Sequence, residues 1–249
     1  MLITAIIPTY NEAENLPILV SYLLSSPLQE LRIVVVDDKS PDETGRVAES
    51  LAATHPGRIE VIHRPRKMGF GTACVSGFRL ALESGAEAIL QMDADLSHSP
   101  DELSKMYAAL ESCDVVIGSR YVAGGRLDER WPLWRSGLSA FGNAYARTIL
   151  GLPLRDVTSG FRLWRREALQ SLPLEHVKSN GYVFLVETAY LAHRLGYRFS
   201  EVPIYFAERQ FGQSKMNLNL QLEAAFRVWQ VLWSHRKVRR QGTEVRSQE

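Results

Sequence analysis

Three stretches in the first hundred residues have acidic side chains whose spacing could serve chemistry. They are Asn11-Glu12, Asp37-Asp38 and Asp93-Ala94-Asp95. Carboxylates that meet at one crevice repel one another, and a hard divalent cation that also bridges to phosphate oxygens relieves that repulsion. The pattern therefore indicates a cation-dependent site for a phosphorylated ligand.

Each stretch also has a simpler interpretation. Asp38 precedes Ser40-Pro41-Asp42 and could belong to a turn and a helix cap. Asp93 and Asp95 could likewise form a turn before the next helix. The pair at 93 and 95 favours function, because the buried run Ile89-Leu90-Gln91-Met92 directly before it fixes where the two carboxylates point.

The elements that must position these residues alternate along the first half of the chain. Apolar β-branched runs cover residues 4–8, 32–37, 59–63, 88–92 and 115–118, and helix candidates begin near Asn11, Asp42, Gly71 and Pro100. This alternation is typical of βαβ units, whose parallel strands are apolar throughout. Ligands bind outside the carboxyl ends of such strands, where the polar residues lie. The sequence predicts an α/β fold with a mostly parallel central sheet and flanking helices.

Start signals mark two of the helices. Ser40-Pro41-Asp42-Glu43 and Ser99-Pro100-Asp101-Glu102 each place a cap, a first-turn proline and early acids in order. After Gly118 the chain changes character. We predict a charged loop over 120–132, an amphipathic aromatic stretch over 131–152, a helix over 181–195, a strand over 199–206, a polar loop over 207–216 and a last helix over 218–233.

Without an internal repeat or an obvious linker, the chain reads as one catalytic domain over residues 1–235. That domain includes two amphipathic, interfacial helices at about 131–152 and 217–235, and residues 236–249 are predicted to be a basic, disordered tail. No apolar run approaches the ~20 residues that span a bilayer, and residues 1–4 lack signal-peptide features. We expect a cytoplasmic protein without a transmembrane segment.

Composition narrows the classes of function. The 249 residues are 45% apolar and 23% charged, as in globular proteins. A net charge of only +1 argues against binding to nucleic acid. Cys74 and Cys113 have no metal-ligand spacing and are expected to be small core residues.

In their order along the chain, these motifs resemble the family 2 glycosyltransferases of the GT-A (Rossmann-like) fold. The resemblance rests on Ile7 to Glu12, Val34 to Asp38 and Met92 to Leu96. Further motifs make the chain similar to the dolichol-phosphate (polyprenol-phosphate) mannose synthases. They are Gly118-Ser119-Arg120-Tyr121-Val122 with Gly124-Gly125, Ser159-Gly160-Phe161-Arg162, and Arg209 through Gly212, Ser214 and Lys215. The resemblance extends from Ile3 to about Trp233.

The resemblance implies a role for each matching residue. The nucleoside would be held by Pro8, Tyr10, Glu12, Val36 and Asp38. Mg²⁺ or Mn²⁺ and the diphosphate would meet Asp93 and Asp95, with backbone contact from Ala94. Ser97 stands where some relatives have a glutamine that helps to bind the metal, so its oxygen is the weaker ligand.

A cationic set would complete the site. Arg120, Arg135, Arg209 and Lys215 are expected to converge on two phosphorylated substrates, although any of them could be a solvated surface charge. Asp95, Arg120, Arg209 and Lys215 form the expected catalytic set. His98 need not be a general base, since a phosphate acceptor is already mostly a dianion at neutral pH, and it is expected to be structural or supporting. Glu187 could face the acceptor, pair with Arg194 or point to water.

The resemblance implies transfer of mannose from GDP-mannose to a polyprenyl (dolichyl-type) phosphate, with inversion and release of GDP. A UDP-sugar donor such as UDP-glucose is the alternative within the class, and a non-catalytic nucleotide-sugar-binding subunit is the alternative outside it. A lipid acceptor implies peripheral contact with the cytosolic face of a membrane, through the two interfacial helices. A separate membrane-anchoring subunit is a possible partner.

Overall fold

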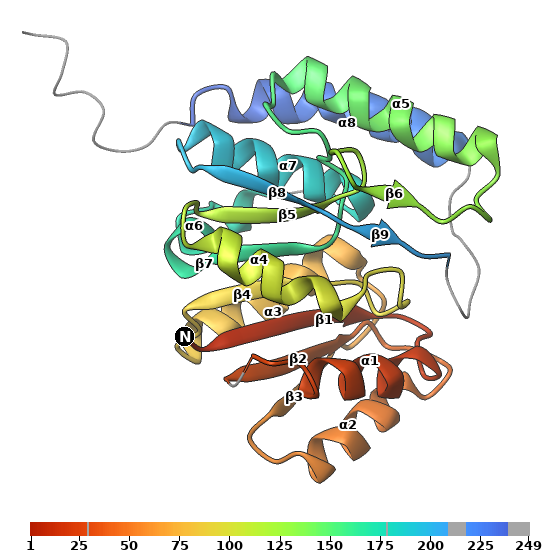
Figure 1. Cartoon of the computed structure of the whole chain (residues 1–249), viewed down its shortest axis with the longest axis vertical. Helices are drawn as coiled ribbons and strands as arrows, with labels where there is room; N and C mark the ends of the chain where they lie inside the picture. The colour runs from red at the N-terminus through yellow and green to blue at the C-terminus, as the bar shows by residue number, and fades with distance from the viewer. Residues whose placement is uncertain (29, 178, 209–217, 239–249) are drawn as a thin grey trace, which may run out of the picture.

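A seven-stranded sheet forms the centre of the molecule. The computed structural model describes residues 1–28, 30–177, 179–208 and 218–238, with the backbone alone for 218–224. The strand order is β3-β2-β1-β4-β7-β5-β8 (Figure 1). Their bounds are β1 Ile3–Thr9, β2 Leu31–Asp37, β3 Ile59–His63, β4 Ala88–Gln91, β5 Val115–Ser119, β7 Arg162–Arg165 and β8 Phe199–Pro203.

The sheet is mostly parallel, as the sequence predicts. β1 pairs in parallel with β2 and β4, β2 with β3, and β5 with β8. β7 is antiparallel to both of its neighbours, β4 and β5. Because β1, β2 and β4 are adjacent and parallel, their carboxyl ends meet at one edge, which brings the three acidic stretches to the same end of the sheet.

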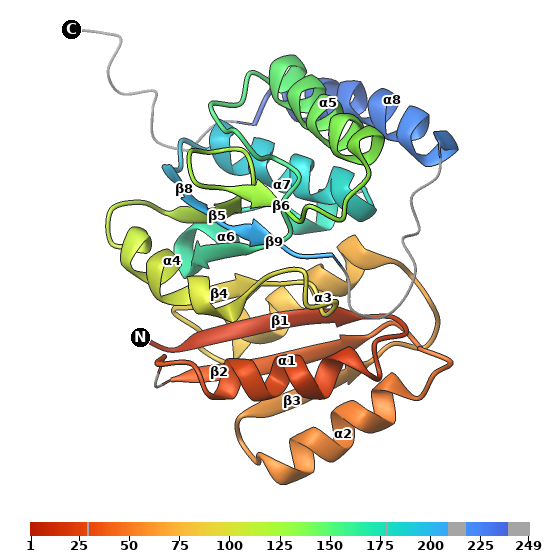
Figure 2. The same cartoon turned by 45° about the vertical axis from the view of Figure 1, so that its right-hand side comes forward.

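Helices cover both faces of the sheet (Figures 1 and 2). α5 and α8 lie side by side at one end of the molecule, beyond α7, and α1 and α2 lie toward the other end. Their bounds are α1 Asn15–Leu24, α2 Thr44–Thr54, α3 Phe70–Glu83, α4 Leu103–Leu110, α5 Leu133–Leu150, α6 Arg166–Gln170, α7 Gly181–Arg194 and α8 Leu218–His235. The predicted helices over 181–195 and 218–233 correspond to α7 and α8.

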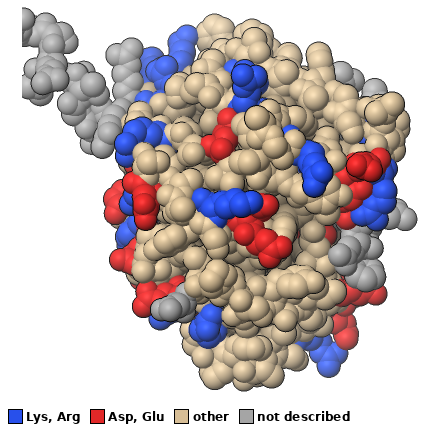
Figure 3. All heavy atoms as spheres, in the orientation of Figure 1, with Lys and Arg blue, Asp and Glu red and all other residues tan. Residues whose placement is uncertain are grey.

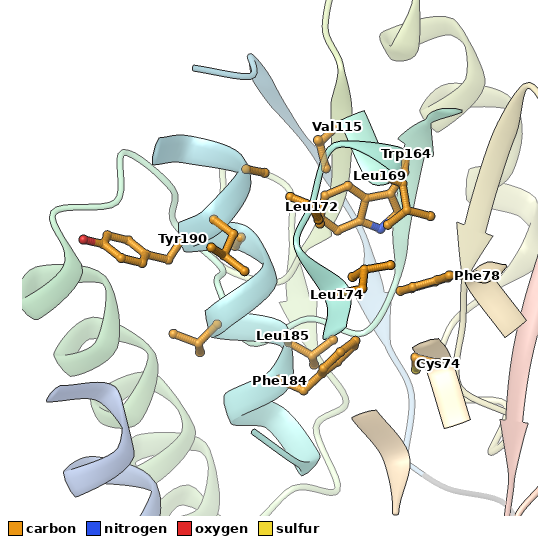
Figure 4. Packing of buried hydrophobic residues seen from close by; sticks show 14 of the residues in the cluster. Cys74, Phe78, Val115, Trp164, Leu169, Leu172, Leu174, Phe184, Leu185 and Tyr190 are labelled. Atoms are coloured by element: carbon orange, nitrogen blue, oxygen red, sulfur yellow. The ribbon is translucent and has the colours of Figure 1, made fainter. Parts of the chain in front are cut away.

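α7 is the most deeply buried helix near the site. Its residues 183–192 are all buried, which is the pattern of a helix that is covered all round. Phe184 stacks on Phe78 of α3 with ring centroids 6.4 Å apart. Figure 4 shows these two rings in one cluster with Trp164 of β7 and Leu169 of α6. This packing fixes α7 against the sheet, between the strands and the outer pair of helices.

Two local predictions need correction. The predicted strand over 199–206 is divided: β8 ends at Pro203, and β9 (Tyr205–Phe206) pairs with β6 (Arg126–Leu127) in a separate two-stranded sheet. Ser99 caps its helical turn by accepting from the Asp101 amide. Ser40 does not cap α2, because its hydroxyl donates to Asp37 at 2.5 Å and α2 begins only at Thr44.

The distribution of charged side chains over the surface agrees with the small net charge of the chain. Acidic and basic side chains are interspersed on the face shown in Figure 3, without a broad area of one sign. Within the ranges that the structure describes, no helix is long and apolar enough to cross a membrane. The tail beyond Val238, predicted to be disordered, lies outside the described residues.

Candidate functional site

A cavity of about 770 Å³ opens at the carboxyl ends of β1, β2 and β4. It brings together most of the residues that the sequence singles out. Those in its lining are Pro8, Tyr10, Glu12, Asp38, Asp93, Ala94, Asp95, Ser97, Arg120 and Arg135. Val36 is fully buried in the core beside Gly77 of α3. Arg209 and Lys215 lie outside the described residues.

The acidic turn after β4 is tightly wound. The amide of Ser97 donates to Oδ1 of Asp95 at 3.1 Å, and Leu96 between them has a φ of 61°. A left-handed conformation is uncommon for leucine and has a cost that the surrounding structure must offset. Asp95 is buried, whereas the Asp93 side chain is about one-third exposed to the cavity. The turn therefore presents two carboxylates at different depths.

The donor set of this turn fits a magnesium or manganese ion that arrives with a phosphorylated ligand. Within the described residues, no group of three or more His, Cys, Asp or Glu side chains is placed to hold an ion by itself. Mg²⁺ is usually bound by one or two carboxylates while substrate phosphates and water supply the other ligands. Asp93 and Asp95 offer those two carboxylates, and the Ser97 hydroxyl is buried beside them without a hydrogen-bond partner in the described residues.

The second acidic strand end is neutralised by the protein itself. Asp38 forms an ion pair with Arg64 at 2.9 Å and accepts hydrogen bonds from the amides of Met68 and Gly69 at 2.8 and 2.7 Å. From the sequence, a divalent cation is expected to relieve the repulsion among all three acidic strand ends. The structure shows that Arg64 relieves part of it, so the need for a cation is concentrated at Asp93 and Asp95.

The same contacts position the loop from Arg64 to Gly69, whose residues Lys67 and Gly69 line the cavity together with Tyr10 and Glu12. The ammonium group of Lys67 lies 3.6 Å from the centre of the Tyr10 ring. A cation over an aromatic face is attracted by the ring quadrupole. Glu12 accepts a hydrogen bond from Asn15 at 2.7 Å. Lys67 and Arg64 were missed at the sequence level, since a basic loop after β3 has no distinctive spacing.

Arg120 is a fixed cation in the cavity wall. Its Nε and Nη2 donate to the two oxygens of Asp156 at 2.7 and 2.8 Å, and Nη2 also donates to Thr158 at 2.7 Å. Arginine forms such paired contacts because its guanidinium is planar and matches a carboxylate. Asp156 itself is fully buried. Asp156 could not be identified as the partner of Arg120 from the sequence, because it lies in a loop of ordinary composition.

The loop that carries Asp156 also contacts the acidic turn. Its backbone amides at 155 and 156 donate to Glu201 of β8 at 2.7 and 2.8 Å. At Gly160, a Cβ atom would lie only 2.9 Å from Asp93 Oδ2, so any other residue here would displace the Asp93 carboxylate. The Ser159-Gly160-Phe161-Arg162 motif therefore shapes the space around Asp93.

Arg162 anchors this loop to α7 from inside the core. It is fully buried and donates to the carbonyls of Val157, Ser159 and Leu185 at 2.8, 2.9 and 2.7 Å. Burial lowers the pKa of Arg162 to about 10, although the charge of Asp156 opposes the shift. The side chain thus ties β7, the loop over 157–160 and α7 together, and no substrate contact is needed to explain it.

Arg135 lies at the start of α5, on the far side of the cavity. Its guanidinium pairs with Glu208 at 3.0 Å and stacks on the Trp131 ring at 3.8 Å. The structure describes two arginines of the predicted cationic set, Arg120 and Arg135. Each is held by a carboxylate and lies next to the cavity. Partial neutralisation leaves each of them able to meet an anion through its remaining N–H groups.

The other half of the cavity is apolar. Side chains from three helices line it: Leu138, Phe141 and Tyr145 of α5, Val183, Leu185 and Val186 of α7, and Ala225 and Val228 of α8. Tyr145 also links α5 to α8, since its hydroxyl donates to the Ala225 carbonyl at 3.2 Å and accepts from Trp229 at 2.9 Å. The cavity thus joins an acidic and cationic end to an apolar end.

Glu187 takes none of the three places that the sequence suggests, since it is buried. It forms a buried pair with His235 of α8 at 2.7 Å and accepts a hydrogen bond from the Ser179 amide at 3.1 Å. Arg194 instead donates to the carbonyl groups of Val238 and Arg236, just after the end of α8. Both residues therefore attach α8 to α7.

Comparison with known proteins assigns the chain to a class. Residues 4–172, more than half of the chain, match the family described as Glycosyl transferase family 2. The chain belongs to this family. It is 44% identical over 224 residues to the polyprenol monophosphomannose synthase of Mycolicibacterium smegmatis, covering 90% of this chain and 84% of that protein.

A second relative points to the same group of enzymes. The chain is 43% identical over 228 residues to the undecaprenyl-phosphate mannosyltransferase of Micrococcus luteus, covering 92% of this chain and 93% of that protein. Among solved structures, glucosyl-3-phosphoglycerate synthase from Mycobacterium tuberculosis has the same fold. Its complex with phosphoglyceric acid gives a TM-score of 0.66 at 15% identity, over 94% of this chain and 79% of that one. Its complex with Mn²⁺ and uridine diphosphate gives 0.65 at 18% identity. This likeness confirms the predicted GT-A-like fold.

Proposed function

We propose that this chain transfers mannose from GDP-mannose to the phosphate of a polyprenyl phosphate, forming a polyprenyl-phosphate mannose and GDP. One observation carries the proposal: a single cavity has acids and fixed arginines at one end and an apolar lining from α5, α7 and α8 at the other. A nucleotide-sugar suits the first end and an isoprenoid chain suits the second. The names of the two curated relatives, both polyprenyl-phosphate mannosyltransferases, support this choice.

The acidic turn would bind the leaving diphosphate through a cation and stabilise its charge. Asp93 and Asp95 would hold a Mg²⁺ or Mn²⁺ ion against it, with Ser97 as a weaker ligand. Such an ion stabilises the negative charge that develops on the departing oxygen. Arg120, fixed by Asp156, would add a cation that needs no rearrangement during the reaction. The roles proposed for Arg209 and Lys215 rest on their match to the family motif.

The acceptor needs little activation. A phosphate monoester has a second pKa near ~6 and is mostly a dianion at neutral pH. Catalysis then depends on holding an acceptor oxygen in line with the anomeric carbon. That oxygen forms the new glycosidic bond as the bond to the diphosphate breaks, which inverts the anomeric configuration. Arg135, beside the apolar half of the cavity, is the proposed contact for the lipid phosphate.

The helices around the apolar half would meet a bilayer surface. Trp134 of α5 and Trp233 of α8 are 70% and 62% exposed, and Leu133, Phe141 and Phe226 are exposed beside them. Arg227, Arg236 and Lys237 provide cations on or just after α8. Exposed aromatic and apolar side chains edged by cations are typical of interfacial helices. Because Phe141 also lines the cavity, an acceptor chain would pass from the lipid into the site.

A product assay tests the function directly. Purified protein is incubated with Mg²⁺ or Mn²⁺, a short polyprenyl phosphate and either GDP-mannose or UDP-glucose, and the lipid product is measured. We expect a mannolipid that depends on the metal, and little product from UDP-glucose. Donor binding without any glycolipid would contradict the proposal and favour a non-catalytic subunit. Glucolipid alone would favour the UDP-sugar alternative.

The Asp95→Ala variant links that activity to the acidic turn. We expect loss of turnover by at least about a hundredfold, because a missing metal ligand leaves leaving-group charge unstabilised, together with loss of metal-dependent GDP binding. Glu60→Ala is the matched control, since it removes an exposed carboxylate from β3. Unchanged turnover of the Asp95 variant would overturn the mechanism.

A further inference from the structure

His98 is a buried polar side chain that the proposed mechanism does not use. It is only 1% exposed, and within the described residues neither of its ring nitrogens has a hydrogen-bond partner. Its Nε2 lies 3.5 Å from Oδ2 of Asp93, close to the carboxylate but without the geometry of a hydrogen bond. A buried polar group without a partner is costly, so its retention calls for an explanation.

The surroundings hold the imidazole in place from both sides. Phe161 stacks on it with ring centroids 5.1 Å apart, and Phe206 meets it edge-on at 5.0 Å. The backbone is also fixed, because His98 forms an isolated β-bridge with Phe206 and the Ala207 amide donates to the Ser97 carbonyl at 3.0 Å. The ring can therefore neither leave nor rotate far, while the neighbouring Asp93 side chain faces the cavity.

His98 is absent from the described residues that line the cavity, so it is not placed to touch a substrate. A general-base role is excluded by that burial. Among the described residues, the charged group recorded next to its ring is the Asp93 carboxylate. Carboxylates that bind metals are themselves usually hydrogen-bonded by a neighbouring group, which fixes their orientation.

We propose that His98 is a positioning residue for Asp93. When a cation and a diphosphate engage the acidic turn, a small adjustment of Asp93 lets Nε2–H donate to Oδ2, and the other carboxylate oxygen is then oriented toward the cation. Gly160 helps, because the absence of a Cβ atom leaves room for Asp93 beside that loop. This inference rests on the proposed metal site, and it assigns the tautomer with the proton on Nε2.

The test compares variants that keep or lose the donor. His98→Phe retains a ring between Phe161 and Phe206 but has no N–H group, and His98→Gln retains an N–H donor. The primary measurement is the affinity for Mn²⁺ in the presence of GDP. Electron paramagnetic resonance gives the concentration of free Mn²⁺ in this titration. We expect His98→Phe to weaken Mn²⁺ binding by about tenfold, in the range for loss of a group that supports a metal ligand, and His98→Gln to recover part of it.

Thermal unfolding separates this role from simple packing. His98→Phe should unfold at or above the temperature of the wild type, because it removes two ring nitrogens that have no hydrogen-bond partner in the described part of the chain. If it fails to fold, His98→Met serves as the second variant without a donor. Mn²⁺ affinity equal to that of the wild type in a folded variant without the donor would overturn the proposal.

A double-mutant cycle gives an independent readout. If His98 acts through Asp93, adding His98→Phe to Asp93→Asn should weaken Mn²⁺ binding no further than Asp93→Asn alone. Fully additive losses would count against the coupling. The outcome is separable from the proposed function, because wild-type protein that binds Mn²⁺ and GDP but forms no mannolipid would overturn the function and leave the His98 result intact.

Discussion

Arg120 and Asp156 form the best-defined charged pair of the site. Burial by itself would raise the pKa of Asp156, but the charge of Arg120 and its hydrogen bonds outweigh burial and hold that pKa below its usual value. Burial likewise opposes the charge of Arg120, yet Asp156 raises the pKa of the guanidinium overall. Both groups therefore stay ionised under ordinary conditions, and Arg120 remains a fixed positive charge beside the cavity.

We expect Asp156→Asn to lose about 3 kcal/mol of unfolding free energy at neutral pH, because it leaves Arg120 buried without its counter-ion. The pKa of Asp156 is lower in the folded than in the unfolded chain, so its contribution is present above the unfolded pKa and is lost as pH falls through the folded value. The difference between wild type and variant should shrink below about pH 4. Urea unfolding at a series of pH values measures the difference in unfolding free energy between wild type and variant. A difference that stays constant with pH would contradict a lowered pKa for Asp156.

At the scale of elements, the position of α8 decides the shape of the apolar half of the cavity. α8 is held to α7 by the buried pair of Glu187 and His235 and by Arg194, and to α5 by Tyr145. Breaking a buried pair costs much more than breaking an exposed one, because the remaining partner stays buried without compensation. Of these attachments of α8, the buried pair of Glu187 and His235 is therefore expected to cost most when it is broken.

We expect Glu187→Leu to lower the unfolding free energy by about 3 kcal/mol and to increase amide hydrogen exchange in α8 before the strands of the sheet are affected. Glu49→Leu is the matched control, because Glu49 pairs with His63 at 2.8 Å but both side chains are exposed. The control should lose at most about 1 kcal/mol. Equal losses for the two variants would show that burial of the pair is unimportant.

At the scale of the whole molecule, the exposed aromatic side chains of α5 and α8 lie at one end of the structure. α5 and α8 lie together beyond α7 (Figure 2). Both helices have exposed aromatic side chains, and both contribute residues to the apolar half of the cavity. The acidic turn lies at the strand ends and lines the same cavity. A bilayer met by α5 and α8 would therefore supply the lipid acceptor from one direction, while the nucleotide-sugar enters from the aqueous side.

We expect the chain alone to bind vesicles that contain anionic phospholipid, and the double variant Trp134→Ser, Trp233→Ser to bind at least about tenfold more weakly, since two large apolar side chains no longer enter the interface. Tyr22→Ser is the control, as Tyr22 of α1 is 57% exposed on another part of the surface. Co-sedimentation with vesicles measures both. Unchanged binding of the double variant would contradict the bilayer contact, and binding only with a second membrane protein would point to an anchoring subunit.

The amino-acid sequence by itself determined the sheet and the acidic end of the cavity. Continuous apolar runs predict parallel strands. Because ligands bind at the carboxyl ends of such strands, the residues that follow each run can be assigned to the ligand-binding edge of the sheet. Asp93, Asp95 and Tyr10 could be located in this way because each lies within a few residues of the end of its strand. β7 escaped prediction, since Arg162-Leu163-Trp164-Arg165 is short and has a buried arginine at its start.

Only the tertiary structure decided which groups are partners. Asp156 meets Arg120 across 36 positions of the sequence, and His235 meets Glu187 across 48. Arg64 and His98 likewise gain their roles from neighbours that other strands bring to them. Local periodicity records which face of an element is buried, but it holds no information on which distant element covers that face. The pairing of buried charges is set by packing, and packing exists only in the folded chain.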